Sequence, residues 1–325
     1  EVEDGDEGEA TDVRALVESV NIAKTLKEEK LKEISSIVKT GFEDDYESRK
    51  TWETAAKEYT KLALQVKEEK TYPWAGASNV KYPLLSTAAM QFNARAYPSL
   101  VPSGGKVVKA VVVGKDPTGE KKERAERVSA YMSYQIMEEM DCWEEDMDKL
   151  LIMLPIVGTL FKKTYFDTVK KRPVSKLVLA HNLVVNNWAT SLEEAERISE
   201  IIRISPRNLK SKQLSEIYLD KDLGSPRVYE DDFYPEVGVN SSDTTLPYQL
   251  IEQHCFLDLD DDGYAEPYIV TFERHSGEIL RITARFTTEG VYLNSKNKVA
   301  AIDPTHYYTK YGFIPNADGS FYDIG

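Results

Sequence analysis

The stretch 72-YPWAGASNVKYPLL-85 lies between two helical patterns and differs in composition from both. Pro73 and Pro83 disfavour helix at its two ends, and Gly76 permits backbone conformations that other residues avoid. A serine and an asparagine follow, whose short polar side chains bond to nearby backbone or cap the next helix. The sequence therefore predicts a shaped loop, and the simplest interpretation is a rigid connector with a buried tryptophan. Its four candidate structural residues are Trp74, Gly76, Ser78 and Asn79.

Amphipathic helices are predicted on both sides of this loop. Apolar residues recur at three- and four-residue steps from Val13 to Val38 and, beyond a boundary near Gly41, from Trp52 to Val66. Further helices are predicted at 84–97, where Pro98 would end the helix, at 120–154, and after the capping residues Ser191 and Ser205.

Strands are predicted where β-branched and aromatic residues gather or alternate with polar ones. One strand is expected at 106–113, between glycines, and an antiparallel hairpin at 160–167 and 174–180. A three-stranded meander is expected at 248–257, 267–273 and 279–286, with a turn at His275, Ser276 and Gly277. The predicted fold class is therefore α+β, with long amphipathic helices packed against antiparallel sheet.

The composition indicates a globular protein with an acidic surface. Of 325 residues, 41% are hydrophobic and 30% charged, and the formal net charge is −14. This charge argues against tight unspecific DNA binding, although it allows DNA to slide past. No apolar run approaches the roughly 20 residues of a membrane-spanning helix, and we expect a cytosolic chain. Cys142 and Cys255 are expected to be buried thiols.

Two charged clusters are candidate sites. The most basic patch lies on the predicted hairpin and comprises Lys162, Lys163, Lys170, Lys171 and Arg172. One interpretation is that this patch contacts DNA or an acidic neighbouring subunit. The other, which we favour, is an ordinary charged hairpin. An acidic run between Glu138 and Asp148 is predicted to line the solvent side of its helix, because no histidine accompanies it as a catalytic or metal site would require. We expect these two clusters on opposite sides of the molecule.

The residues Asp258, Asp260 and Asp262 are weak candidates for a metal site. With Gly263 they match the first half of a calcium-binding loop, but Ile269 stands where a bidentate glutamate belongs. A hairpin turn is therefore favoured. The four histidines are too scattered for ligand spacing, and no nucleophile motif or dinucleotide fingerprint occurs. We expect neither an enzyme nor a bound cofactor.

Five stretches, in this order, resemble the N-terminal region of the portal proteins of tailed bacteriophages, specifically the podophage-type family. The first is the W-x-G-x-S-N-x-K-x-P-L loop at Trp74. The others are 107-VVKA-110, 158-GTLFKKTYFD-167, 257-LDLDDDGYAEPY-268 and 318-DGSFYDIG-325.

This resemblance implies a portal wing-type domain of a structural virion protein. The family forms a homododecameric ring at one capsid vertex, the head–tail connector through which DNA is packaged and ejected. Implied partners are the major capsid protein, scaffold, terminase, head-completion and tail proteins, and double-stranded DNA in the channel. The Trp74 loop would then support a contact between subunits. The alternative is a monomeric calcium- or nucleic-acid-binding module.

The expected organisation follows the chain in sequence. Residues 1–12 are predicted to be a disordered acidic tail, and 13–104 a helical region that carries the Trp74 loop. Residues 105–223 would form the α+β wing core and 224–247 an irregular acidic and aromatic loop. The β-rich region 248–325 would lead towards a stem, with stem, clip and crown absent.

Overall fold

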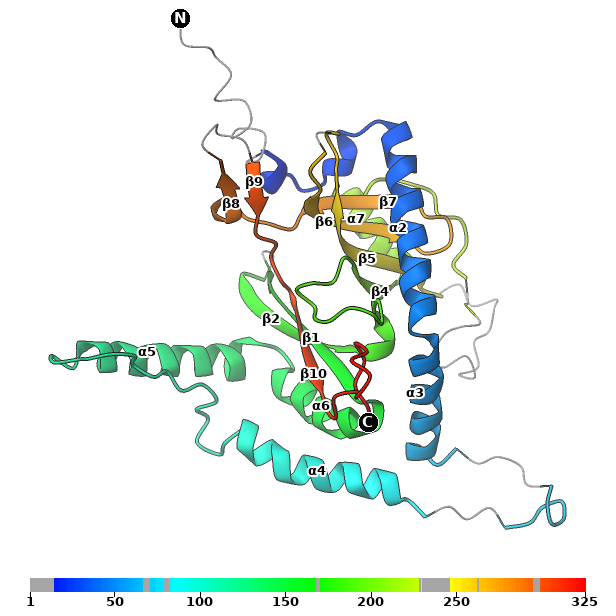
Figure 1. Ribbon diagram of the computed structural model, residues 1–325, viewed down its shortest axis with the longest axis vertical. Coiled ribbons are helices and arrows are strands. Elements are labelled where there is room, and N and C mark those ends of the chain that lie inside the picture. The colour runs from blue at the N-terminus through cyan, green and yellow to red at the C-terminus, as the bar shows by residue number, and fades with distance from the viewer. Residues whose placement is uncertain are drawn as a thin grey trace, which may run out of the picture. The chain divides into compact units, whose positions relative to one another are not determined.

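The computed structural model describes residues 15–66, 71–78, 82–167, 170–227, 229, 246–261, 263–294 and 299–325. Helices and antiparallel sheets make up an α+β protein, which confirms the predicted fold class at that level. The chain divides into two compact units, each assembled from distant parts of the sequence (Figure 1). Unit 1 contains the chain up to Lys50 and His181–His306, and unit 2 contains Thr51–Ala180 and Tyr307–Gly325. The predicted tail at 1–12 and most of the predicted loop at 224–247 lie outside the described residues.

Unit 1 is built on a five-stranded antiparallel meander in which each strand pairs with the next along the chain. Its strands are β3 (Leu183–Val185), β4 (Ile198–Ile204), β5 (Tyr248–Leu257), β6 (Glu266–Glu273) and β7 (Ile279–Ala284). The three-stranded meander predicted from the sequence is confirmed as β5 to β7. Two short strands, β8 (Val291–Leu293) and β9 (Val299–Ile302), pair separately. Unit 1 also contains the 3₁₀ turns η1 (Ile22–Lys24) and η4 (Thr288–Gly290), and a third, η3 (Ala180–Asn182), begins at the last residue before the unit resumes.

Helices cover both faces of this sheet. The helix α2 (Glu28–Ser48) places apolar residues from Leu31 to Phe42 in one core cluster with Ile251 of β5. The next residue, Leu250, points to the opposite face because side chains alternate along a strand. There it packs with Leu209 of α7 (Pro206–Leu214), whose predicted cap Ser205 accepts a hydrogen bond from the Asn208 amide.

Unit 2 contains a three-stranded antiparallel sheet in the order β10-β1-β2. The hairpin of β1 (Thr159–Asp167) and β2 (Arg172–Leu179) confirms the sequence prediction, and β10 (Tyr308–Gly312) adds the other edge. The helical elements are α3 (Lys50–Ala63), α4 (Leu84–Leu100), α5 (Glu120–Tyr134), the π-helix η2 (Gln135–Glu139) and α6 (Trp143–Val157). Aromatic residues of α4 pack with leucines of α6 and with Leu160 of β1 in one core cluster.

Several local predictions were wrong. The segment 106–113 pairs with no strand among the described residues; instead Val108 exchanges hydrogen bonds with the hydroxyls of Ser129 and Ser133 on α5. The helix predicted at 120–154 is interrupted before α6 at Cys142, which has a φ of 59° and is exposed rather than buried. Cys255, the other cysteine, is buried as expected.

Two further helix boundaries differ from the prediction. The helix α4 continues through Pro98 to Leu100. After Ser191 no helix forms, although the Glu194 amide donates to the Ser191 hydroxyl as a cap would require. This single hydrogen bond closes a bend instead of starting a helix, and the chain then continues into β4.

The segment Phe321–Asp323 is anchored inside unit 2. Phe321 stacks on Phe161 of β1 with ring centroids 6.1 Å apart, and Tyr322 stacks on Trp52 of α3 at 4.2 Å. The Asp323 amide donates to the Thr159 hydroxyl at 2.7 Å. All three residues of the segment are buried, so they tie α3 and β1 together.

Gly158 makes this packing possible. Its φ is 85°, and a Cβ built on it would lie 2.2 Å from the Asp323 carbonyl oxygen. Gly114 has a similar φ of 89°, but a Cβ there would meet nothing within 4 Å.

These two glycines give a matched test. We expect Gly158→Ala to destabilise the protein by about 3 kcal/mol, since backbone strain and overpacking add. Gly114→Ala should cost only the strain, roughly 1 kcal/mol. Denaturant unfolding of both variants measures the difference, and equal losses would show that the close approach to Asp323 contributes nothing.

Candidate interaction surfaces

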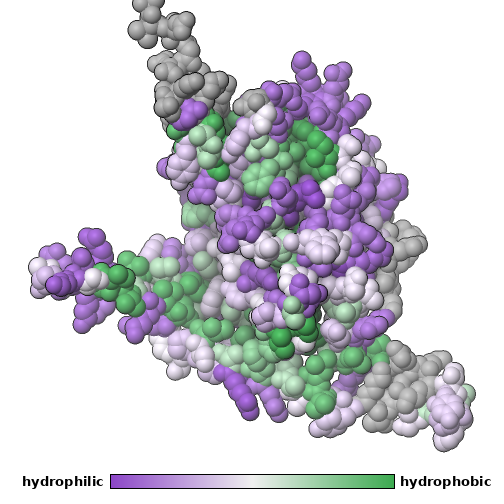
Figure 2. Space-filling view, viewed as in Figure 1, coloured by the Kyte–Doolittle hydropathy of each residue, from purple (hydrophilic) through white to green (hydrophobic). Residues whose placement is uncertain are grey.

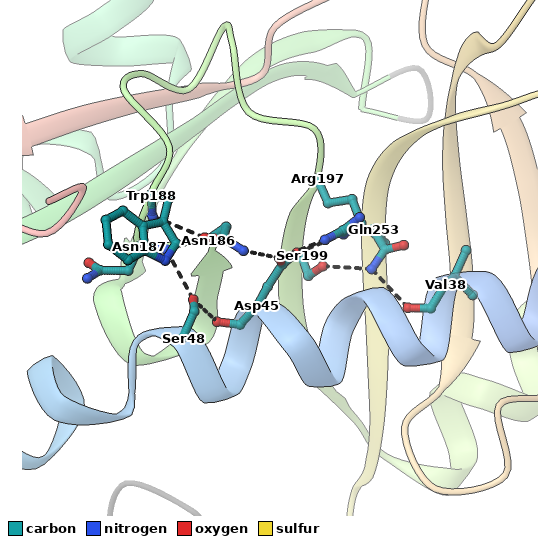
Figure 3. Close-up of polar contacts among 9 residues, drawn as sticks. All are labelled: Val38, Asp45, Ser48, Asn186, Asn187, Trp188, Arg197, Ser199 and Gln253. Atoms are coloured by element: carbon teal, nitrogen blue, oxygen red, sulfur yellow. Dashed lines mark hydrogen bonds and ion pairs between the residues drawn. The ribbon is translucent and has the colours of Figure 1, made fainter.

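A buried carboxylate on α2 organises the first surface. The Asp45 side chain is fully buried, and the Arg197 guanidinium donates one hydrogen bond of 2.9 Å to each of its oxygens (Figure 3). The amide of Asn186 donates a third, also at 2.9 Å. The hydrogen bond to Asp45 raises the pKa of Arg197. Bidentate pairing of this kind fixes both position and orientation.

Gly41 provides the space for this arginine. A Cβ at that position would lie 2.8 Å from the Cδ atom of Arg197. The glycine therefore sits inside α2, where it is normally unfavourable, because the arginine crosses the helix there. The boundary predicted near Gly41 is accordingly wrong.

The same network holds a loop, residues 186–197, which we call the Trp188 loop. The Ser48 hydroxyl accepts a hydrogen bond of 3.1 Å from the Asn187 amide, and the Trp188 amide donates to the Asn186 side-chain oxygen at 3.0 Å (Figure 3). The Trp188 side chain is nevertheless 89% exposed. An aromatic ring is thus presented to solvent on a backbone fixed at both neighbouring residues.

An open pocket of about 380 Å³ adjoins this ring. Glu194 and Glu196 line it together with Trp188 and with Arg197, whose charge is paired with Asp45, and Glu193 is exposed nearby. Cations are attracted both to indole faces and to carboxylates, so the pocket suits a positively charged side chain. No motif in the sequence predicted it, although the 186-NNW-188 run before clustered glutamates was a usable signal.

The Trp74 loop is a second exposed aromatic surface. Trp74 is 66% exposed, so the interpretation as a buried connector is wrong, and Tyr72 and Tyr82 are exposed as well. A turn is present, because the Ala77 amide donates to the Trp74 carbonyl, and Gly76 has a φ of 80°. The predicted residue Asn79 lies outside the described residues, whereas Ser78 lies within them.

Apolar side chains are also exposed on the helices of unit 2. Figure 2 shows them in green along α4 and α5, among purple hydrophilic residues. The large ones include Leu84, Met90, Val128 and Met132. Exposed apolar patches of this kind mark interaction surfaces.

The basic hairpin is less uniform than the sequence indicated. Lys162 points inwards: it is 2% exposed, and its ammonium lies 5.0 Å from the centroid of the Trp143 ring. Burial lowers the pKa of Lys162 to about 8, against an opposing attraction from Asp146. This lysine therefore does not belong to the surface patch. Lys163 lies over the Tyr308 ring, 5.3 Å from its centroid.

The expected separation of the basic and acidic clusters is wrong. Arg172 forms an ion pair with Asp141 and donates to the Glu139 carbonyl at 3.1 Å, while the Lys170 ammonium lies 3.7 Å from Asp141. Lys171, at the turn, has a φ of 52° and is exposed. The two clusters thus contact each other within unit 2.

Other carboxylates of the acidic run bind neighbouring elements rather than face only solvent. Asp146 accepts a hydrogen bond of 2.8 Å from the Leu177 amide of β2, and Asp148 accepts one of 2.8 Å from Asn93 of α4. Tyr97 of α4 donates to Glu144, and this bond raises the pKa of Tyr97 to about 12. These acids hold α4 and β2 against α6.

The acidic turn joins β5 to β6, which confirms the hairpin interpretation. Asp258 accepts a hydrogen bond of 2.9 Å from the Gly263 amide, and Asp261 pairs with Lys30 at 2.6 Å. Asp260 is also described, whereas Asp262 is not. Within the described ranges, no group of three or more histidine, cysteine or acidic side chains is arranged to hold a metal ion.

No protein-family model and no curated protein matches the chain. No helix in the described part of the chain has the length and apolar character needed to cross a membrane.

We expect Asp45→Asn to destabilise the protein by about 3 kcal/mol, because Arg197 would keep a half-buried charge without its counter-ion. Asp220→Asn, which removes an exposed pair with Lys210, should cost about 0.5 kcal/mol or less. Hydrogen exchange should show faster exchange at the amides of Asn187 and Trp188 in the Asp45 variant alone. Unchanged exchange there would mean that the network does not hold the Trp188 loop.

Lys162→Met should stabilise the protein at pH 7 by about 2 kcal/mol, because it removes a buried charge. The pKa of Lys162 in the folded protein, about 8, lies below the ordinary lysine value of 10.5, so the unfolded chain binds more protons between these values. Wild-type stability therefore rises with pH in this window, and the advantage of methionine shrinks. Unfolding at pH 7 and pH 10 tests this, with Lys163→Met as the half-exposed control; a constant advantage would contradict it.

Proposed function

We propose that this chain is the wing-type portion of a phage portal protein, a subunit of the ring through which DNA enters and leaves the capsid. The observation that carries the proposal is the packing of two of the stretches that resemble this family. The stretches 158-GTLFKKTYFD-167 and 318-DGSFYDIG-325 are distant in sequence, yet they share the buried contacts of Phe161 with Phe321 and of Thr159 with Asp323. Two of the five stretches that resemble the family therefore meet in one structural core of unit 2.

The exposed surfaces also support a subunit of a ring. Subunits that join head to tail need two different, complementary faces, and the ring closes when the rotation per contact is right. Unit 1 exposes the Trp188 loop, and unit 2 exposes the Trp74 loop together with apolar residues of α4 and α5. Aromatic residues of this kind dominate the binding energy of many interfaces.

In this proposal the protein does structural work and catalyses no reaction. The ring would be a dodecamer that docks on the capsid and receives the scaffold, terminase and head-completion or tail proteins. DNA would pass through the channel, and a net charge of −14 favours sliding over tight binding. Lys163, Lys170, Lys171 and Arg172 remain candidates for contact with DNA or with a neighbouring subunit.

The test is the native mass of the protein, followed by negative-stain imaging of the same sample. Closed rings with a central hole are the expected result. A persistent monomer whose melting temperature rises with calcium, or which binds duplex DNA with steep salt dependence, would instead support the module described as the alternative.

We expect Trp74→Ala to weaken assembly about tenfold or more, the usual effect of removing an aromatic anchor from an interface. Tyr292→Ala, which truncates an exposed aromatic residue of β8, is the control and should assemble normally. Sedimentation velocity over a concentration series measures both. Normal assembly of the Trp74 variant would remove this loop from the proposed contact.

A further inference from the structure

Lys171 of the basic hairpin is exposed at the turn between β1 and β2. Arg172 is engaged with Asp141 and Glu139, and Lys162 is buried over Trp143. The turn at Lys170 and Lys171 is exposed. Lys170 also pairs with Asp141, at 3.7 Å, so it is the charge of Lys171 at this turn that is available to another molecule.

The acidic helix does not offer the matching surface to a neighbour. Asp141, Asp146 and Asp148 already bind groups of unit 2. The Trp188 loop, in contrast, belongs to unit 1 and combines an exposed indole with exposed Glu193, Glu194 and Glu196. It offers a cation both an aromatic face and carboxylates beside an open pocket.

We propose that the Trp188 loop of one copy of this chain binds the Lys170–Lys171 turn of a second copy. The inference rests on the proposed function, because it names the two surfaces that meet between neighbouring ring subunits. The surfaces belong to different units of the chain, so the contact is heterologous and repeats from copy to copy.

The Asp45 network prepares the acceptor before binding. Asn186 is held by Asp45, and Asn187 is held by Ser48, so the backbone beside Trp188 is fixed in the isolated chain. A fixed loop loses little conformational freedom on association, and more of the contact energy appears as affinity. An exposed indole contributes little to the stability of the fold, and a role in binding explains why it is there.

The experiment uses two charge reversals in the full chain, Lys171→Glu and Glu196→Lys. Each variant alone should associate about tenfold more weakly than wild type, because like charges then meet at every contact. An equimolar mixture of the two should recover association, since an alternating order restores opposite charges at each contact. Recovery also shows that both variants are folded and that the contact lies between chains.

Matched controls carry the same charge changes elsewhere: Lys106→Glu in unit 2 and Glu289→Lys in unit 1, both at exposed positions. Neither should change association. Trp188→Ala should weaken it about tenfold as well, and high salt should weaken the wild type. Sedimentation velocity gives the affinities, and negative-stain images give the form of the assembly.

The outcomes separate this inference from the proposed function. Wild-type rings that are insensitive to both reversals would overturn the inference and leave the portal proposal in place. Association that follows the charge pattern but yields open chains would support the inference and overturn the portal proposal. A wild-type chain that stays monomeric at every concentration would overturn both.

Discussion

Unit 1 depends on one constraint: the buried carboxylate of Asp45 would cost folding free energy if it had no partners. A buried charge is tolerated when it is paired and hydrogen-bonded, and Arg197 and Asn186 supply those partners from the segment between β3 and β4. A second polar contact lies nearer the N-terminal end of α2, where Gln253 of β5 donates to the Val38 carbonyl and to the Ser199 hydroxyl (Figure 3). Apolar contacts hold α2 against the sheet, and these polar contacts fix the position of the helix along the sheet.

Local patterns predicted the β1–β2 hairpin, the strands β5 to β7 and the cap at Ser205, whereas β3, β4 and β8 to β10 were not predicted. Long-range contacts decided the elements that the sequence misassigned. The continuous helix α2 does not follow from local patterns. Its glycine, Gly41, makes room for Arg197, which binds Asp45 from 152 positions further along the chain. The segment around Val108 has strand-like composition, yet its polar partners are serines of α5.

The candidate surfaces show the same limit. Composition identified the basic hairpin, but it could not distinguish the buried Lys162 from the exposed Lys171, because strand orientation and a neighbouring indole decide that difference. The Trp74 loop was recognised as a shaped segment, while its exposure was not. Trp188 was missed although the 186-NNW-188 run precedes clustered glutamates, because this run does not reveal the fixed backbone and the exposed ring that folding produces.

The interleaved course of the chain through the two units has a consequence for synthesis on the ribosome. The apolar face of α2 emerges early, whereas the strands β5 to β7 that cover it emerge after most of unit 2 has been made. Unit 2 in turn is completed when Phe321 and Tyr322 reach Phe161 and Trp52. Unit 1 is not complete until His306 has been made, and unit 2 is not complete until residues 307–325 follow. The apolar face of α2 therefore stays uncovered while residues 51–180 of unit 2 are synthesised, and such a chain depends on chaperones that shield α2 until its sheet arrives.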